Sequence, residues 1–381
     1  MASIYLDHAA TTPLDPRVLD AMRPYWSEQF GNPSSLHRFG QAAAAALEDA
    51  RCQTAGVLGC APEEISFTGC GSESDNLALR GVALEQRKRH GKRHLITMPI
   101  EHHAVGHTMA QLRDDFGYEL TVLPVDGDGR VDPADVARAI RPDTALVSVM
   151  YANNEIGTIE PLAEIARVAH ERGVPLHTDA VQAAGQLTLN VDALGVDLLS
   201  ISSHKFYGPK GVGALYVRKG TPFVSTLTGG GHEGGRRAGT QNVPGIAGLA
   251  AALTLAYAEL ERHTAHYRLL RDRLVRGMLA IPDVRLTGHP TERLPNNASF
   301  VIRNTTGQDL LIRLDLAGIA ASSGSACLVG NPEPSDVLLA LGLPREWALG
   351  ALRLTVGRMT TAEDIDVVVA ALPGIVQALR T

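Results

Sequence analysis

The chain has 381 residues, of which 45% are hydrophobic and 20% charged, so it is long enough to bury a large core and to form one large and one small domain. Lys and Arg together number 35 against 41 Asp and Glu, and the formal net charge of -6 argues against direct binding of nucleic acid or of an anionic membrane. The N-terminal sequence MASIYLDHAATTP has no basic segment followed by a long apolar run, and no window approaches the roughly 20 apolar residues of a membrane span. The four cysteines, Cys52, Cys60, Cys70 and Cys327, have no C-x-x-C spacing, which is typical of free thiols in a reducing compartment. We therefore expect a cytoplasmic protein that acts on a small molecule.

The first informative stretch along the chain is a glycine-rich turn, FTGCGSESDN, at residues 67–76. After a strand-like lead, Gly71 and the pattern Ser72-x-x-Asp75 form a capping-box candidate at the start of a long helix. Such a turn offers backbone N–H groups and a favourable helix dipole to a phosphate, although a plain helix start is the simpler interpretation. The basic run RKRHGKRH at residues 87–94 falls where this helix should end, a position that favours cations. A docking patch for an acidic partner is the alternative interpretation of this run.

Between residues 94 and 219, short β-branched runs alternate with helical or turn segments. One intervening segment, PLAEIARVAHERG, is predicted to be a helix with Pro161 at its start and Gly173 at its end. The predicted strands are HLITM, YELTVLPV, TALVSVM, VPLHTDA, DLLSISS and GALYVRK. This alternation predicts an α/β fold with a mainly parallel sheet covered by helices on both faces.

Beyond the sheet, the pattern changes to a long helical stretch, roughly Ala247 to Leu279, which we predict leads out of the large domain. A strand (NNASFVIR), a helix (QDLLIRLDLAG), a loop that holds Cys327 and a final helix from about Thr361 to Arg380 follow. We assign residues 16–255 to a large domain, and residues 1–15 together with 256–381 to a smaller α+β domain that carries the Cys327 loop.

Polar side chains gather where the predicted strands end, and in open α/β sheets ligands bind at the carboxyl ends of the strands. A single polar residue at such a position is usually a cap or a surface group, but several at one edge indicate a site. The residues concerned are Asn153, Asn154 and Glu155 after the third run, Asp179 and Gln182 after the fourth, and Ser202, His204 and Lys205 after the fifth.

Lys205 follows an apolar strand, where its amine could form a Schiff base with an aldehyde, whereas Lys210 lies in the turn GPKGVG and is expected to be solvated. Pyridoxal phosphate requires such a lysine, an acid beside its ring nitrogen and a cradle for its phosphate. Lys205, Asp179 and the set Ser72, Ser202 and His204 meet these three requirements. The residues therefore favour a pyridoxal-phosphate enzyme.

The sequence resembles the NifS-like cysteine desulfurases of the housekeeping type (group I), which are fold-type I pyridoxal-phosphate enzymes of the class-V aminotransferase family. The similarity runs over nearly the whole chain. The matching strings are YLDHAATTP, FGNPSS, ESDNLAL, EHHAV, NNEIG, HTDAVQ, SSHKFYGPKGVGALYV, GGGHEGGRRAGT, SSGSAC and LRLTVGR. The resemblance implies a large domain with a mainly parallel seven-stranded sheet and a smaller α+β domain.

The resemblance also implies roles for individual residues. Lys205 would be the Schiff-base lysine and general base, Asp179 would pair with the ring nitrogen, and His102 would stack on the cofactor ring and take part in catalysis. Asn154 and Gln182 would lie near the phenolic oxygen of the cofactor, and Asn154 and Arg353 would bind the substrate. The cofactor phosphate would be held by Gly71, Ser72, Ser202 and His204, together with Thr240 from the neighbouring subunit of a homodimer.

Cys327 would be the nucleophile of such an enzyme. It lies in SSGSACLVGNPEPSD, a segment rich in small residues, Gly and Pro that is typical of an exposed loop rather than of a buried cysteine. The implied reaction converts L-cysteine to L-alanine and leaves the sulfur as a persulfide on Cys327. A sulfur-acceptor protein, either an iron–sulfur scaffold or a tRNA-thiolation protein, would then take the sulfur.

Other interpretations lead to other predictions. A metal site built from His102, His103 and His107 would leave Lys205 and Asp179 without a purpose, and a plain aminotransferase would not need a thiol on a loop. A non-catalytic scaffold would not need this set of catalytic residue types, whereas L-selenocysteine would suit the same site as L-cysteine.

The chain also departs from the family pattern. Gly234 stands where many relatives have arginine, Leu328 follows the nucleophile where a small polar residue is common, and Cys70 occupies a turn position where glycine is the commoner choice. The chain ends at IVQALRT without a longer tail, so we expect docking to an iron–sulfur scaffold to differ.

Overall fold

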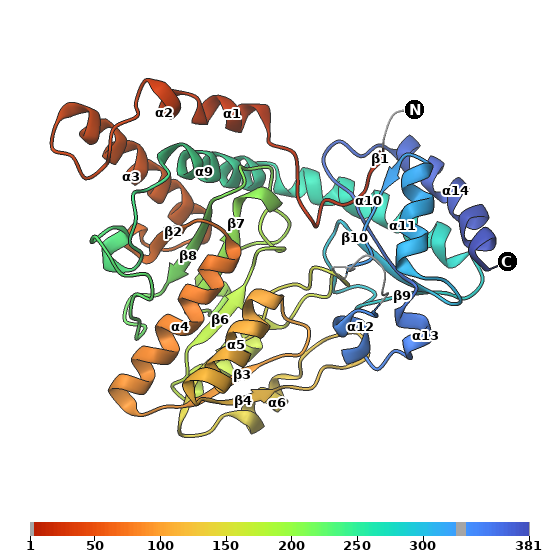
Figure 1. Cartoon of the computed structure of the whole chain (residues 1–381), viewed down its shortest axis with the longest axis horizontal. Helices are drawn as coiled ribbons and strands as arrows, with labels where there is room; N and C mark the ends of the chain where they lie inside the picture. Colours follow the sequence, from red (N-terminus) through yellow and green to blue (C-terminus); the bar gives the residue numbers. More distant parts are fainter. Residues whose placement is uncertain (1–3, 325–332, 381) are drawn as a thin grey trace.

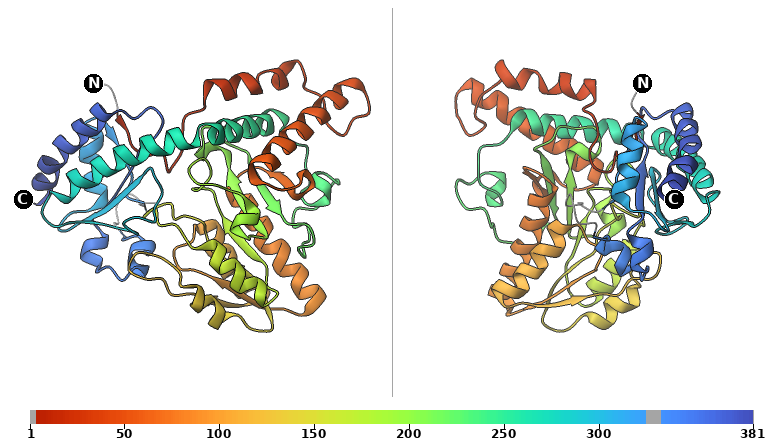
Figure 2. Two further views of the ribbon diagram at one scale, coloured as in Figure 1. Left: turned by 180° about the vertical axis from the view of Figure 1, so that it is seen from behind. Right: turned by 45° about the vertical axis from the view of Figure 1, so that its right-hand side comes forward.

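The computed structural model describes residues 4–324 and 333–380, and Cys327 lies outside these ranges. Figure 1 shows a larger part built around a twisted sheet and a smaller part that contains the C-terminal helices. A long helical connection runs between the two parts (Figure 2).

The central sheet of the larger part has seven strands. In sheet order these are β2 (Ile65–Thr68), β8 (Gly213–Val217), β7 (Leu198–Ser202), β6 (Leu176–Asp179), β5 (Thr144–Ser148), β3 (His94–Thr97) and β4 (Glu119–Val122). The pairs from β7 through β6, β5 and β3 to β4 are parallel, and β8 runs antiparallel to both β7 and β2. The predicted mainly parallel sheet is therefore confirmed.

Helices cover both faces of this sheet, which explains why its inner strands consist of apolar runs. On β3, Leu95 packs into a cluster with α4 and α5, whereas its neighbour Ile96 packs into the larger core on the other face. Leu198 and Leu199 on β7 divide in the same way. The helices of the larger part are α1 (Pro16–Met22), α2 (Pro24–Ser27), α3 (Arg38–Leu58), α4 (Gly71–His90), α5 (His103–Phe116), α6 (Pro133–Ala139), α7 (Leu162–Glu171), α8 (Val191–Leu194) and α9 (Val243–Ala258).

The smaller part is an α+β unit around a three-stranded antiparallel sheet in the order β12-β10-β9. The N-terminal strand β1 (Ile4–Tyr5) also belongs to it, because β1 pairs with β11 (Ile319–Ala320) and Leu6 enters the small core. The other elements are α10 (Leu260–Leu279), β9 (Val284–Leu286), β10 (Asn297–Ile302), α11 (Gly307–Leu316), α12 (Asp336–Ala340), α13 (Arg345–Ala348), β12 (Ala351–Thr355) and α14 (Ala362–Arg380). The domain limits 16–255 and 256–381 stay a prediction.

The prediction of one continuous helical stretch over 247–279 was wrong. The structure divides it into α9 and α10, which are bent by 72° at the break. Glu259 leaves the helical conformation at this break, and its carboxylate accepts a hydrogen bond from Arg17 of α1 at 3.0 Å. No single helix within residues 4–324 and 333–380 is long and apolar enough to cross a membrane, and this bent pair is the one combination there that passes by length and composition.

Candidate active site

A cavity of about 340 Å³ opens at the carboxyl ends of β6 and β7, the edge at which the sequence places the polar residues. It collects side chains from α4, β12 and the loops after β3, β5, β6 and β7, together with backbone from the N-terminal segment. The predicted site residues that line it are Gly71, Ser72, His102, Asn154, Asp179, Gln182, Ser202, His204, Lys205 and Arg353.

Lys205 lies in a short 3₁₀ turn directly after β7, and this turn directs the side chain into the cavity. Its Nζ donates hydrogen bonds to the carbonyl oxygens of Ala9 at 2.6 Å and Ala10 at 2.8 Å. Burial, followed by the nearby cation of Arg353, lowers the pKa of the Lys205 amine to about 8. A substantial fraction of this amine is therefore uncharged near neutral pH, unlike the amine of an exposed lysine. By contrast, Lys210 is exposed.

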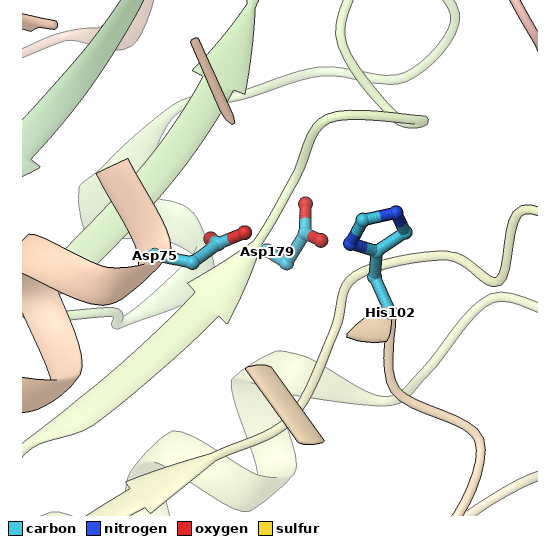
Figure 3. Close-up of side chains that lie close together, drawn as sticks. All are labelled: Asp75, His102 and Asp179. Atoms are coloured by element: carbon cyan, nitrogen blue, oxygen red, sulfur yellow. The ribbon is translucent and has the colours of Figure 1, made fainter. Parts of the chain in front are cut away.

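Asp179 ends β6, and its carboxylate faces His102 across the cavity (Figure 3). The backbone N–H of Val181 donates to its Oδ1 at 2.8 Å. Burial raises the pKa of Asp179, whereas His102, this N–H group and Lys205 lower it. These three groups partly stabilise the ionised form of this buried acid, which is therefore suited to hold a protonated ring nitrogen.

His102 is the N-cap of α5, and its Nδ1 accepts a hydrogen bond from the N–H of Ala104 at 3.1 Å. Burial lowers the pKa of His102, against the raising effect of Asp179. The imidazole is therefore held in a fixed orientation as a neutral ring at the cavity wall.

The N-terminus of α4 forms the other end of the cavity. A side chain at Gly71 would bring a Cβ to 2.8 Å from Cγ2 of Val181 and to 3.2 Å from Cβ of Ser202, so only glycine keeps this space open. The predicted capping box of Ser72 and Asp75 was wrong: the N-cap is Cys70, whose Sγ accepts from the N–H of Glu73 at 3.4 Å. Ser72 therefore does not cap α4, and it lines the cavity at a helix N-terminus, a favourable place for a phosphate.

Arg353 lies in the middle of β12 and crosses from the smaller part to the cavity. Its Nη2 contacts Oδ1 of Asp7 at 2.8 Å, and its Nη1 donates to the carbonyl oxygen of Asn154 at 2.9 Å. Arg353 is 5% exposed and lines the cavity. A buried cation therefore faces the space in which an anionic group of a ligand could bind.

The N-terminal segment closes the side of the cavity near Lys205. The Gln182 side chain donates through Nε2 to the carbonyl oxygen of Ala9 at 3.0 Å, and Nδ1 of His204 lies 3.1 Å from the Oγ1 of Thr11. Burial lowers the pKa of His204 to about 4, so its imidazole is neutral and can act as a hydrogen-bonding group.

Two predicted site residues are not among the described residues that line this cavity. Thr240 is exposed and does not line it, as expected if it acts in a neighbouring subunit, and Cys327 lies outside the described residues. The three histidines of the alternative metal site lie near one another, since the ring centroids are 6.2 Å apart for His102 and His103 and 4.8 Å apart for His103 and His107. Within residues 4–324 and 333–380, the three-residue group that could hold a metal ion is Asp75, His102 and Asp179, inside the same cavity.

Sequence reasoning missed two acidic residues of the site. Asp7 was noted only as part of YLDHAATTP, yet it pairs with Arg353 across 346 positions of the chain. Asp75 was interpreted as a capping residue, but it is buried and lines the cavity beneath Asp179. Ala78 and Leu79, three and four residues after Asp75 and therefore on the same helix face, are the signal that could have indicated a buried carboxyl group.

Comparisons with known proteins place the chain in one family. The model of the aminotransferase class-V family matches residues 4–368. The cysteine desulfurase IscS of Methanosarcina thermophila is 50% identical over 378 residues, which cover 99% of this chain and 93% of that protein. A cysteine desulfurase of Trichormus azollae is 46% identical over 381 residues, covering 100% of this chain and 94% of that protein. Among solved structures, a NifS-like protein superimposes with a TM-score of 0.92 at 39% identity, covering 99% of this chain and 100% of that chain.

Proposed function

We propose that this chain, which belongs to the aminotransferase class-V family, is a pyridoxal-phosphate-dependent cysteine desulfurase. It converts L-cysteine to L-alanine and transfers the sulfur to an enzyme cysteine. The single observation that carries the proposal is the convergence of Lys205, Asp179 and Arg353 on one cavity, in a chain whose relatives are named cysteine desulfurases.

The residues of the cavity fit pyridoxal phosphate. Gly71, Ser72, Ser202 and His204 would hold the phosphate at the start of α4, in space that a Cβ at residue 71 would fill. Asp179 would bind the ring nitrogen, His102 would pack on the ring, and Asn154 and Gln182 would lie beside its phenolic oxygen. When bound, this cofactor supplies an electron-accepting ring that stabilises negative charge at the substrate Cα.

Lys205 serves as the base of the reaction. Its amine can accept the Cα proton because burial and Arg353 bring its pKa to about 8, close to the working pH of a cell. The carbonyl oxygens of Ala9 and Ala10 hold the amine in the cavity and can stabilise its protonated form.

Arg353 binds the substrate carboxylate, since a planar guanidinium suits this group. Asp7 and the Asn154 carbonyl hold two of its nitrogens and so fix the orientation of the guanidinium at the cavity. The substrate thus enters with its carboxylate toward β12 and its amine toward Lys205.

Sulfur transfer requires a thiolate, and Cys327 provides it in our proposal. A bond forms between Cys327 Sγ and the substrate sulfur while the substrate C–S bond breaks. The electron pair of the C–S bond stays on carbon, which takes up a proton and becomes the methyl group of alanine. The sulfur remains on the enzyme as a persulfide.

The physiological setting is also part of the proposal. We place the enzyme in the cytoplasm as a homodimer in which Thr240 completes the phosphate site of the neighbouring subunit. The persulfide then passes to a sulfur-acceptor protein for iron–sulfur cluster assembly or tRNA thiolation. The exposed position of Thr240 supports this arrangement, because an interface residue must be accessible in the isolated chain.

The test is alanine release from L-cysteine by the purified protein, with and without a thiol reductant. Cys327→Ala is expected to keep the yellow colour of the bound cofactor and to lose alanine release and protein-bound persulfide. Cys52→Ala, which removes an exposed free thiol of α3, is the matched control and should behave as wild type. A yellow wild-type protein that releases no alanine, or an active Cys327→Ala variant, would refute the proposal.

A further inference from the structure

Asp75 is a buried acid whose position is not explained by helix capping. It is the fifth residue of α4 and is 1% exposed, and its carboxyl group is directed toward Asp179 (Figure 3). One side-chain atom of each of Asp75, His102 and Asp179 lies within 4.8 Å of the others. Oδ1 of Asp75 has no hydrogen-bond partner among the described residues. Two carboxyl groups therefore lie side by side under the position that we propose for the cofactor ring.

The groups behind Asp75 bring no positive charge to offset an anion there. The Ser200 hydroxyl is hydrogen-bonded to Asp75, and Nε2 of His177 lies 3.6 Å from Asp75 Oδ1. The two ring nitrogens of His177 are engaged by hydroxyl groups, at 2.9 Å from Ser148 Oγ and 3.1 Å from Ser200 Oγ. Burial lowers the pKa of His177 to about 3, so its imidazole is neutral.

Asp179 is better supported as an anion than Asp75. It receives the N–H of Val181 at 2.8 Å and faces His102 and Lys205, whereas Asp75 has the Ser200 hydroxyl and the charge of Asp179. Burial and the neighbouring Asp179 raise the pKa of Asp75 well above the ordinary value. A third buried carboxyl group, Glu101, lies close to both members of the pair, and burial, followed by Asp179 and Asp75, raises its pKa well above the ordinary value. Because two adjacent buried carboxylates rarely both ionise, one proton belongs to the pair, and this asymmetry puts it on Asp75.

We propose that Asp75 is a positioning residue for the reaction: it holds a proton as a neutral carboxylic acid behind Asp179, and it thereby keeps the negative charge on Asp179, next to the cofactor ring nitrogen. The inference rests on the proposed function, because the proposed function is what places the cofactor ring nitrogen beside Asp179. With the proton on Asp179 instead, the ring nitrogen would lose its counter-charge. Since α4 begins at Gly71, one helix would hold the phosphate end of the cofactor and set the charge at its ring end.

Two substitutions separate this role from a merely structural one. Asp75→Asn keeps a neutral polar group of the same shape, and Asp75→Leu removes polarity while keeping the branch at Cγ. Glu160→Gln is the matched control, because Glu160 is also a buried acid but binds the N–H of Val131, away from the cavity.

The first readout is the infrared band of protonated carboxyl groups in the cofactor-free protein. Asp75→Asn is expected to remove one component of this band near neutral pH, and a spectrum without that loss would overturn the proposal. Because neither cofactor nor substrate is present, this result does not depend on desulfurase activity. Failure of the proposed function would appear separately, as a wild-type protein with the band but without alanine release.

The second readout is the pH dependence of the visible absorption of the cofactor-loaded enzyme. Asp75→Asn and Glu160→Gln should keep the wild-type midpoint, whereas Asp75→Leu should shift it and slow alanine release about tenfold. A midpoint in Asp75→Asn that moves by about one pH unit or more would mean that Asp75 is ionised in the wild type, which contradicts the proposal. A folded Asp75→Leu variant with an unchanged midpoint would also overturn it, since a purely structural acid would behave in this way.

Discussion

The ionisation of Lys205 can be tested directly, because the structure assigns a cause to each part of its pKa shift. Burial and the Arg353 cation lower the pKa of the amine to about 8, while Asp179 and Asp7 raise it. An ordinary lysine has a pKa of about 10.4. The difference of about 2.4 units corresponds to about 3 kcal/mol favouring the neutral amine. At pH 7 the uncharged fraction rises from about 1 in 2,500 to about 1 in 11, an increase of about 200-fold.

The assay is the rate at which cofactor-free enzyme recombines with pyridoxal phosphate, followed by visible absorption from pH 6 to about pH 10.5. Only the uncharged amine reacts with the aldehyde, so the rate should rise with pH and level off above a midpoint near 8. Arg353→Met removes the lowering cation and should move the midpoint upward, whereas Asp7→Asn removes a raising anion and should move it downward. A wild-type rate that keeps rising to pH 10, or an Arg353→Met midpoint equal to that of the wild type, would refute this reasoning. Thermal unfolding of both variants serves as the control for folding.

Three further predictions follow from single contacts. Gly71→Ala places a Cβ 2.8 Å from Val181 Cγ2, so we expect cofactor affinity to fall at least tenfold in an equilibrium titration, and undiminished affinity would contradict the proposed phosphate position. Ser335→Ala removes a hydroxyl that donates to Glu155 Oε2 at 2.5 Å and caps α12; urea unfolding should show a loss of about 1–2 kcal/mol, which Ser335→Thr should largely restore. His177 has a folded-state pKa of about 3, against about 6.5 when unfolded, so below pH 6.5 the unfolded state binds one more proton and stability falls by about 1.4 kcal/mol per pH unit. His177→Gln should flatten that acid limb by this amount in urea titrations from pH 6 to about pH 4, and an unchanged slope would show that His177 is not buried in its neutral form.

The architecture of the larger part could be predicted from sequence because buried parallel strands have a strong local signature. Runs such as TALVSVM and DLLSISS are apolar on both faces, and each ends in polar residues at one edge of the sheet. The edge rule for ligand sites then placed Asp179 and Lys205 together, and the structure has both at one cavity.

The errors arose where a distant contact decides the local conformation. The break between α9 and α10 lies at Glu259, which pairs with Arg17, 242 positions away. The helix propensity of this Ala- and Leu-rich stretch depends on local residues only, so it could not predict a break caused by that contact. At the start of α4, a serine pattern predicted the cap, but the sulfur of Cys70 occupies the capping position.

The N-terminal segment shows how much of the site depends on such distant contacts. Its strand β1 belongs to the smaller part, yet the carbonyl oxygens of Ala9 and Ala10 hold the amine of Lys205 in the larger part. In the same segment, Asp7 holds Arg353 of β12. A stretch of four residues therefore fixes the distance between the base and the proposed carboxylate-binding group, although their positions in the sequence are far apart.

This arrangement couples substrate binding to the strength of the base. Arg353 lowers the pKa of Lys205 by its positive charge, and a substrate carboxylate bound to Arg353 would offset that charge. The pKa of the amine should then rise when the substrate is present, which makes Lys205 a stronger base at the stage when it must accept the Cα proton. Before the substrate arrives, the same cation increases the uncharged fraction of the amine, which is the form that reacts with the cofactor aldehyde. The Arg353 guanidinium thus suits Lys205 to two tasks: a lower pKa favours its reaction with the cofactor aldehyde, and a higher pKa favours acceptance of the Cα proton. Binding of the substrate carboxylate changes the pKa of the amine from the first value to the second.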